Sequence, residues 1–132
     1  MLTPRVRNAF ALAAAGAALV TLARWRLSRF AIAGESMAPT LAPGDYVVVD
    51  NRAYARRSPP PGDIVLACDP REPSRVIAKR VAGPDGADGV VLLGDNPGQS
   101  TDSRDFGTVR PTDITGRVVW RYWPPARFGP VR

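Results

Sequence analysis

The pattern of apolar and polar positions divides the chain into one apolar N-terminal run and a longer part with short apolar segments. Residues 8–23, NAFALAAAGAALVTLA, carry no charge and lie between arginines. This pattern predicts a membrane helix, although the run is slightly shorter than the ~17 to 25 residues that usually span a bilayer. A buried helix and a signal-peptide core are the alternatives. RWRLSRF follows the run where a cleavage site needs small residues, which favours an uncleaved anchor.

Positive charges flank this run equally. The amino terminus, Arg5 and Arg7 precede it, and Arg24, Arg26 and Arg29 follow it. The positive-inside rule therefore predicts no orientation for the anchor.

From Phe30 onward, β-branched residues occur in short runs between turn residues. Five runs have the length of strands: 46–50, 63–68, 75–81, 89–93 and 115–122. The glycines and prolines between them are turn signals. Short strands without helical periodicity predict a mainly β fold, a small barrel or sandwich. We therefore expect an anchor and juxtamembrane segment, residues 1–29, followed by a β domain, residues 30–132.

Composition excludes several kinds of site. The 132 residues suffice for one domain, and they include no histidine and a single cysteine. A Ser-His-Asp triad, an internal disulfide and a cysteine-based zinc site are therefore excluded, and we expect neither a metal nor a cofactor. The net charge of +6 suits an anionic membrane or nucleic acid. Because the arginines are dispersed and no nucleic-acid-binding motif accompanies them, we expect a lipid bilayer and no nucleic acid as partner.

One basic position differs from all the others. Of the 18 Lys+Arg, only Lys79 is a lysine. Arginine keeps its proton in proteins, whereas a desolvated lysine can lose it. In the predicted strand, Lys79 shares a face with Ile77 and Val81, and Arg80 projects oppositely. This pattern is compatible with a functional lysine, with an edge lysine that reaches solvent and with chance in an arginine-rich chain.

Ser36 lies in GESMAPTL, residues 34–41, just before a predicted strand. Gly34 lets the backbone turn tightly and approach a substrate, as an exposed nucleophile with a backbone oxyanion hole requires. The stretch half resembles a GxSxG elbow, but that elbow needs a histidine partner. Taken alone, a serine before a proline-containing loop favours a turn residue over a nucleophile.

Residues 94–107, GDNPGQSTDSRDFG, predict an irregular loop rich in polar side chains. Ser100 could orient a neutral lysine amine, and a pair of Asp102 and Arg104 could brace the loop. The alternative is a solvated turn. A calcium site is a poor fit, because the alternating Asp/Asn spacing with glycine at the sixth position is missing.

Together these stretches resemble the type I signal peptidase family, whose members use a serine and lysine dyad. The resemblance covers most of residues 30–123. GESMAPTL resembles the nucleophile box, AKRVAG the lysine box, GDNPGQSTDSRDFG the glycine-aspartate-asparagine box and GRVVWRYWP the final strand. The resemblance implies a minimal, signal-peptidase-like β catalytic domain attached to one membrane helix. The implied activity is a membrane-bound serine endopeptidase that removes signal peptides from exported preproteins, with its catalytic domain on the extracytoplasmic side of the cell membrane.

The resemblance also implies residue roles. Ser36 is the nucleophile, Lys79 the general base, and Ser100 the hydroxyl that positions Lys79, while Asp102 and Arg104 form the structural pair of the loop.

Three further positions surround the nucleophile. Gly34 stands where some members carry a serine that assists the oxyanion hole, so only backbone donors such as the Ser36 N–H are implied. Met37 and Pro39 are expected to contact the substrate or the membrane.

Three other functions stay open. A self-cleaving repressor-type protease also uses serine and lysine, but the apolar N-terminal run and the lack of a DNA-binding helix pair speak against it. A dedicated maturation protease for one partner, such as a nickel superoxide dismutase precursor, is an alternative within the family. A non-catalytic, membrane-anchored binding module is the alternative from another class, and it predicts that Lys79→Arg is tolerated.

Overall fold

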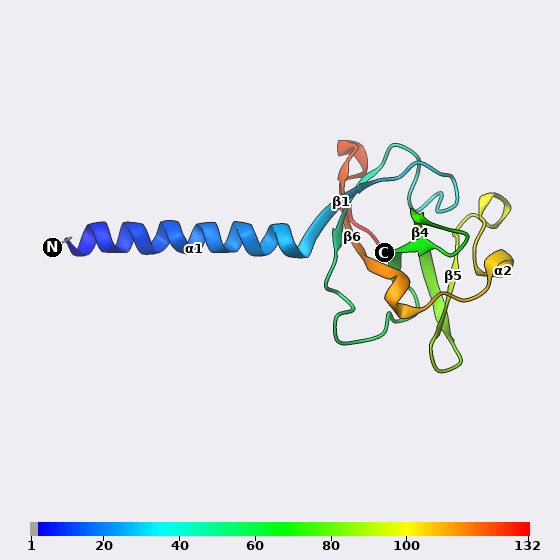
Figure 1. Cartoon of the computed structure of the whole chain (residues 1–132). Coiled ribbons are helices and arrows are strands. Elements are labelled where there is room, and N and C mark those ends of the chain that lie inside the picture. Colours follow the sequence, from blue (N-terminus) through cyan, green and yellow to red (C-terminus); the bar gives the residue numbers. More distant parts are fainter. Residues whose placement is uncertain (1–2) are drawn as a thin grey trace.

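The computed structural model describes residues 3–132 and shows one long helix that extends away from a β domain (Figure 1). The helix α1, Pro4–Arg26, begins with Pro4 in its first turn, and the Thr3 hydroxyl accepts a hydrogen bond from the Val6 N–H. Its 23 residues are exposed along the whole helix. At 1.5 Å per residue it is about 35 Å long, enough to cross a bilayer core of ~30 Å.

The helix therefore extends past both ends of the predicted run 8–23. The flanking arginines continue it, because arginine is a good helix former. α1 is long and apolar enough to cross a membrane.

The anchor joins the β domain directly. Strand β1, Leu27–Ala31, starts at the residue after α1 and pairs with β2, Tyr46–Asp50. Arg26 forms an ion pair with Asp50 at 2.8 Å, and its carbonyl accepts the Asn51 N–H at 2.7 Å. The boundary that we expected after residue 29 thus falls inside β1.

The β domain is one antiparallel sheet, which confirms the predicted mainly β fold. Each of the five predicted runs forms a strand. After β1 and β2, the strands in chain order are β3 Ile64–Asp69, β4 Glu72–Asp85, β5 Gly89–Leu93, β6 Ile114–Trp123 and β7 Gly129–Pro130. The order across the sheet is β1-β2-β6-β3-β4-β5, and β7 pairs with β6.

Short helices occupy the connections between strands. α2, Ser103–Phe106, lies between β5 and β6, on the side of the domain away from α1 (Figure 1). Three 3₁₀ helices span Pro97–Gln99, Pro111–Asp113 and Pro125–Arg127. Each of the three starts at a proline, as expected from its fixed φ angle.

Two apolar clusters make up the core, and β3 lies between them. Ile64 and Leu66 pack into one cluster, while Val65 and Ala67 pack into the other. Both faces of β3 are therefore buried, which explains its continuous apolar sequence.

One part of β4 has a free edge. β3 pairs with Glu72 and residues 76–80 of β4, whereas β5 pairs only with residues 80–85. Among the described residues, no strand covers the β5 side of residues 75–79. This free edge forms one wall of a cavity.

Candidate active site

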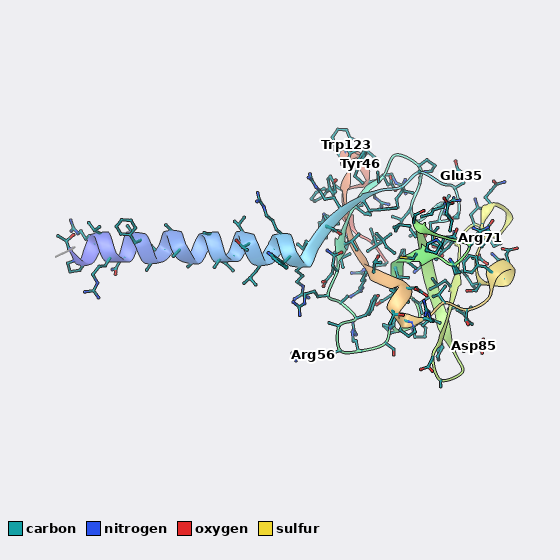
Figure 2. All side chains as sticks on the ribbon, in the orientation of Figure 1. Glu35, Tyr46, Arg56, Arg71, Asp85 and Trp123 are labelled. Carbon is teal, nitrogen blue, oxygen red and sulfur yellow. The ribbon has the colours of Figure 1, made fainter. Side chains whose placement is uncertain are left out.

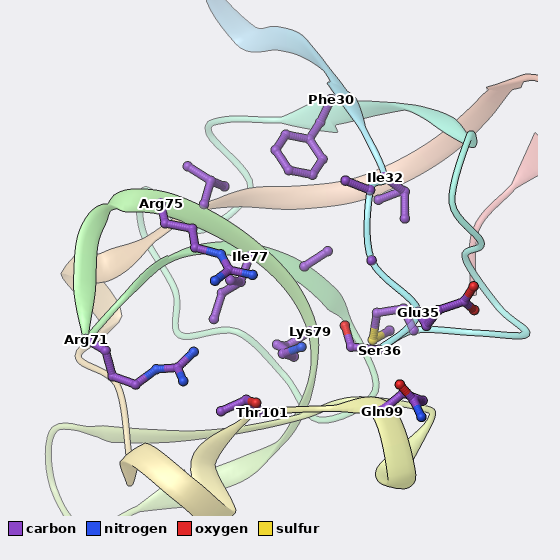
Figure 3. Close-up of a pocket in the computed structure, with 15 residues that line it drawn as sticks. Phe30, Ile32, Glu35, Ser36, Arg71, Arg75, Ile77, Lys79, Gln99 and Thr101 are labelled. Atoms are coloured by element: carbon purple, nitrogen blue, oxygen red, sulfur yellow. The ribbon is translucent and has the colours of Figure 1, made fainter.

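A cavity of about 300 Å³ is lined both by the loop that carries Ser36, residues 34–41, called here the serine loop, and by strand β4, which carries Lys79. Its walls come from Phe30 and residues 32–37, from Arg71 and residues 75–79, and from the loop that includes Gln99 and Thr101. Ser36 and Lys79 both line it, and Figure 3 shows their side chains next to each other. The fold thus brings together the two residues predicted as nucleophile and base.

Lys79 is buried, and no described residue forms an ion pair with it. Its side chain is 4% exposed and lies on the same face of β4 as the buried Ile77 and Val81, as the alternating pattern predicted. Within the described chain, Lys79 takes part in none of the ion pairs. Burial lowers the pKa of Lys79, although the charge of Asp102 opposes the shift. Burial thus shifts the equilibrium of Lys79 toward the neutral amine, which can accept a proton.

Arg80, the next residue along β4, points to the opposite face and anchors the site. Its Nε and Nη2 donate to the Asp95 carboxylate at 2.8 and 2.7 Å, and its Nη1 donates to the Gly62 carbonyl at 2.7 Å. The Thr40 hydroxyl donates to the same carboxylate at 2.7 Å. These hydrogen bonds lower the pKa of Asp95, with Arg80 the largest cause. Asp95 therefore links β4 to the serine loop, because it accepts hydrogen bonds from Arg80 and from Thr40.

Gly94 and Asn96 hold the same loop through its backbone. The Ser36 carbonyl accepts the Asn96 N–H at 2.9 Å, and the Glu35 carbonyl accepts from Asn96 Nδ2 at 3.1 Å. A Cβ at Gly94 would lie 2.6 Å from the Ser36 carbonyl oxygen and would also collide with Ser100. Only glycine permits this close approach of the two loops.

Asp102 organises the loop that carries Ser100. Its carboxylate is fully buried, and it accepts hydrogen bonds from the Gly94 N–H at 2.9 Å and the Ser100 hydroxyl at 2.7 Å. The expected pair with Arg104 forms, at 2.9 Å for Nε and 2.6 Å for Nη2. These contacts lower the pKa of Asp102, with the Arg104 hydrogen bond as the largest cause. Because the Ser100 hydroxyl donates its hydrogen bond to Asp102, its oxygen is left free to accept one.

A second buried carboxylate, that of Asp45, also supports the serine loop, and sequence reasoning missed it. Asp45 is 2% exposed and pairs with Arg121 at 3.1 Å and Arg127 at 3.2 Å. The same arginines donate to loop carbonyls: Arg121 to Thr40 at 2.8 Å and Arg127 to Pro39 at 2.9 Å. The only local signal was an aspartate after a Pro-Gly turn, and nothing in the sequence indicates that distant arginines reach it.

The three residues predicted around the nucleophile have different environments. Gly34 lines the cavity, and a Cβ there would meet no heavy atom within 4 Å. Met37 is 1% exposed and packs in the first apolar cluster, so the expectation that it contacts the membrane is wrong. Its apolar side chain is used for the core, although it also borders the cavity. Pro39 is exposed and lies outside the cavity wall.

Comparison with known proteins places the chain in a family. The family "Signal peptidase, peptidase S26" matches residues 5–88 and 86–123. The chain is 34% identical over 131 residues to the mitochondrial ATP-independent inner membrane protease subunit 1a of Arabidopsis thaliana, covering 83% of this chain and 78% of that protein.

Two further relatives agree. Identity is 34% over 118 residues to the mitochondrial inner membrane protease subunit 1 of Homo sapiens, covering 75% of this chain and 71% of that protein. It is 30% over 141 residues to the signal peptidase I of Leptolyngbya laminosa, covering 74% and 70%. With matches over most of its length, the chain belongs to the signal peptidase family, peptidase S26.

Proposed function

We propose that this chain is a membrane-bound serine endopeptidase that removes signal peptides from exported preproteins with a dyad of Ser36 and Lys79. The observation that carries the proposal is a buried lysine on the wall of the cavity that Ser36 lines, which forms no ion pair with any described residue. Keeping a lysine unpaired in an apolar environment costs stability, and such a cost is expected where the neutral amine has a task.

The two side chains share one proton in the proposed mechanism. Neutral Lys79 Nζ removes the Ser36 Oγ proton, and the alkoxide attacks the carbonyl carbon of the scissile bond. The Ser36 N–H stabilises the oxyanion. As the C–N bond breaks, the Lys79 ammonium protonates the leaving amine. A water then loses its proton to Lys79 and attacks the acyl-enzyme, which releases the second product and restores the Ser36 hydroxyl.

Ser100 is proposed as a positioning residue. Its hydroxyl donates to Asp102 at 2.7 Å, so its lone pairs are available to accept an N–H of Lys79. That hydrogen bond would turn the lone pair of the amine toward Ser36. Arg104 supports the arrangement indirectly, because it holds the Asp102 carboxylate.

The substrate would bind as an extended segment. The free edge of β4 over residues 75–79 offers backbone groups for strand addition, and the cavity beside it would take small side chains before the scissile bond. The helix α1 would hold the catalytic domain, residues 30–132, at the extracytoplasmic side of the cell membrane. The names of the inner membrane proteases among its relatives support a membrane location.

The test is cleavage by the purified full chain in detergent. A peptide with an Ala-x-Ala site is incubated over a range of pH, beside Ser36→Ala and Lys79→Arg. Because burial lowers the pKa of Lys79, activity should rise with pH through an apparent pKa below the ordinary 10.5. Both variants should be inactive yet folded by circular dichroism, since arginine cannot act as the base. Full activity of Lys79→Arg would refute the dyad.

The same assay separates the other functions. Cleavage of one dedicated precursor but of no Ala-x-Ala peptide, lost in both variants, would identify a maturation protease. Binding without any cleavage would identify a binding module.

A further inference from the structure

The guanidinium of Arg75 lies at the cavity that Ser36 and Lys79 line. Arg75 precedes Lys79 by four residues on the same face of β4, and it lines the same cavity. Over the described part of the chain, Arg75 forms no ion pair. Its side chain is exposed, so it is free to receive a ligand. Figure 3 shows its guanidinium pointing toward the other residues that line the cavity.

A second guanidinium, that of Arg71, lines the same cavity. Its Nε and Nη2 donate to the buried Asp69 carboxylate at 3.1 and 2.8 Å. Its guanidinium carbon lies 5.5 Å from the centre of the Phe106 ring. These two contacts fix the orientation of Arg71, and its Nη1 donors stay available. Figure 3 shows Arg71 reaching toward the cavity from the side of Arg75.

We propose that these two arginines bind a carboxylate side chain of the substrate, so that the enzyme prefers Asp or Glu at the fifth residue before the scissile bond. The inference rests on the proposed function. A guanidinium donates in a planar fork that matches a carboxylate, and Arg71 is already oriented.

The position follows from the register of extended strands. A substrate segment along the free edge of β4 advances about 3.3 Å per residue, as β4 does. Neighbouring residues on paired strands project to the same face. If the residue before the scissile bond, position −1, lies level with Lys79, position −3 lies level with Ile77 and position −5 with Arg75. The small residues at −1 and −3 and the acidic residue at −5 then share one face.

The test measures binding separately from cleavage. Fluorescein-labelled 16-residue peptides with an Ala-x-Ala site carry Glu, Gln or Lys at −5, and their Kd is measured by anisotropy with the Ser36→Ala full chain in detergent. The Glu peptide should bind about fivefold more tightly than the Gln peptide at low salt, and the preference should decrease as salt rises.

Arginine variants in the Ser36→Ala background show which residue is responsible. Arg75→Gln should remove the preference, and Arg75→Glu should reverse it in favour of Lys at −5. Arg56→Gln is the matched control, because Arg56 lies in an exposed loop on the side of the domain that bears α1, whereas Arg71 lies on the other side (Figure 2). This variant should keep the full preference.

Each outcome decides between the proposals. Equal binding of the Glu and Gln peptides, or a preference unchanged by Arg75→Gln, overturns the carboxylate site even if the wild-type chain cleaves both peptides. A preference that depends on Arg75 supports the site even if the wild-type chain cleaves neither, in which case the proposed protease activity fails alone. Absence of binding by all three peptides also overturns the site.

Discussion

Replacing Asp102 with asparagine tests whether the buried carboxylate holds the candidate site together. The side chain is fully buried, and its two oxygens accept hydrogen bonds from Gly94, Ser100 and Arg104. Asparagine has nearly the same shape, but it removes the negative charge and turns one acceptor into a donor. Oδ2 alone accepts from all three residues, so an amide nitrogen at that place would face three donors.

The magnitude follows from these contacts. Breaking a buried ion pair by removing one charge costs about 3–5 kcal/mol. Arg104 is 47% exposed and can be solvated when it loses its partner, so the lower end applies. We expect the variant to lose about 3 kcal/mol of the ~5–15 kcal/mol by which domains are typically stable. Cleavage should also fall, because Gly94 and Ser100 lose the acceptor that places them.

The assay is urea unfolding of the full chain in detergent, followed by tryptophan fluorescence. With a slope of ~2 kcal/mol/M, a loss of about 3 kcal/mol lowers the midpoint by about 1.5 M. Because the pKa of Asp102 is lowered below 3.8 in the folded state, its stabilisation is complete above pH 3.8 and disappears as pH falls through the folded pKa. The difference in free energy of unfolding between wild type and the variant should therefore disappear in acid. A midpoint shift below ~0.3 M at neutral pH, or a difference that stays constant in acid, would refute the reasoning.

Three other substitutions test the contacts between the loops. Gly94→Ala should abolish cleavage and lower the thermal midpoint, because its Cβ would collide with Ser100 and the Ser36 carbonyl; wild-type activity would show that the loops need not meet so closely. Gly34→Ser should fold normally and raise kcat, since its Cβ enters open space in the cavity and its hydroxyl can donate to the oxyanion; a kcat at or below that of wild type contradicts this. Asp95→Asn should reduce kcat more than KM and lower the free energy of unfolding in urea by about 2 kcal/mol, because Arg80 and Thr40 lose their shared carboxylate. An unchanged kcat would mean that this link does not position the dyad.

Local patterns predicted most elements of the fold, because β-branched runs and turn residues act over a few neighbours. The runs 46–50 and 89–93 match their strands at both ends. Strand β1 was missed because LSRFA alternates weakly, and it becomes a strand only by pairing with β2. The membrane-contact prediction for Met37 failed for a similar reason: the sequence shows that a side chain is apolar, but not which apolar surface it joins.

For the site, the chain determined by itself which residue types are available for chemistry. The absence of histidine excludes a histidine-based mechanism. The single lysine limits the choice of base for the serine that follows the Gly-Glu pair. The alternation along β4 also predicted that Lys79 lies among apolar neighbours, because strand periodicity is a local property.

Only the tertiary structure decided which charges meet. Arg80 pairs with Asp95, and Asp45 pairs with Arg121 and Arg127, whereas Lys79 forms no ion pair with any residue that the structure describes. A chain with 18 Lys+Arg and 12 Asp+Glu permits many pairings, and the sequence carries no local signal that selects among them. The selection is made by sheet register and loop packing, which bring distant segments within hydrogen-bonding distance. The same packing buries Lys79, and this burial lowers its pKa.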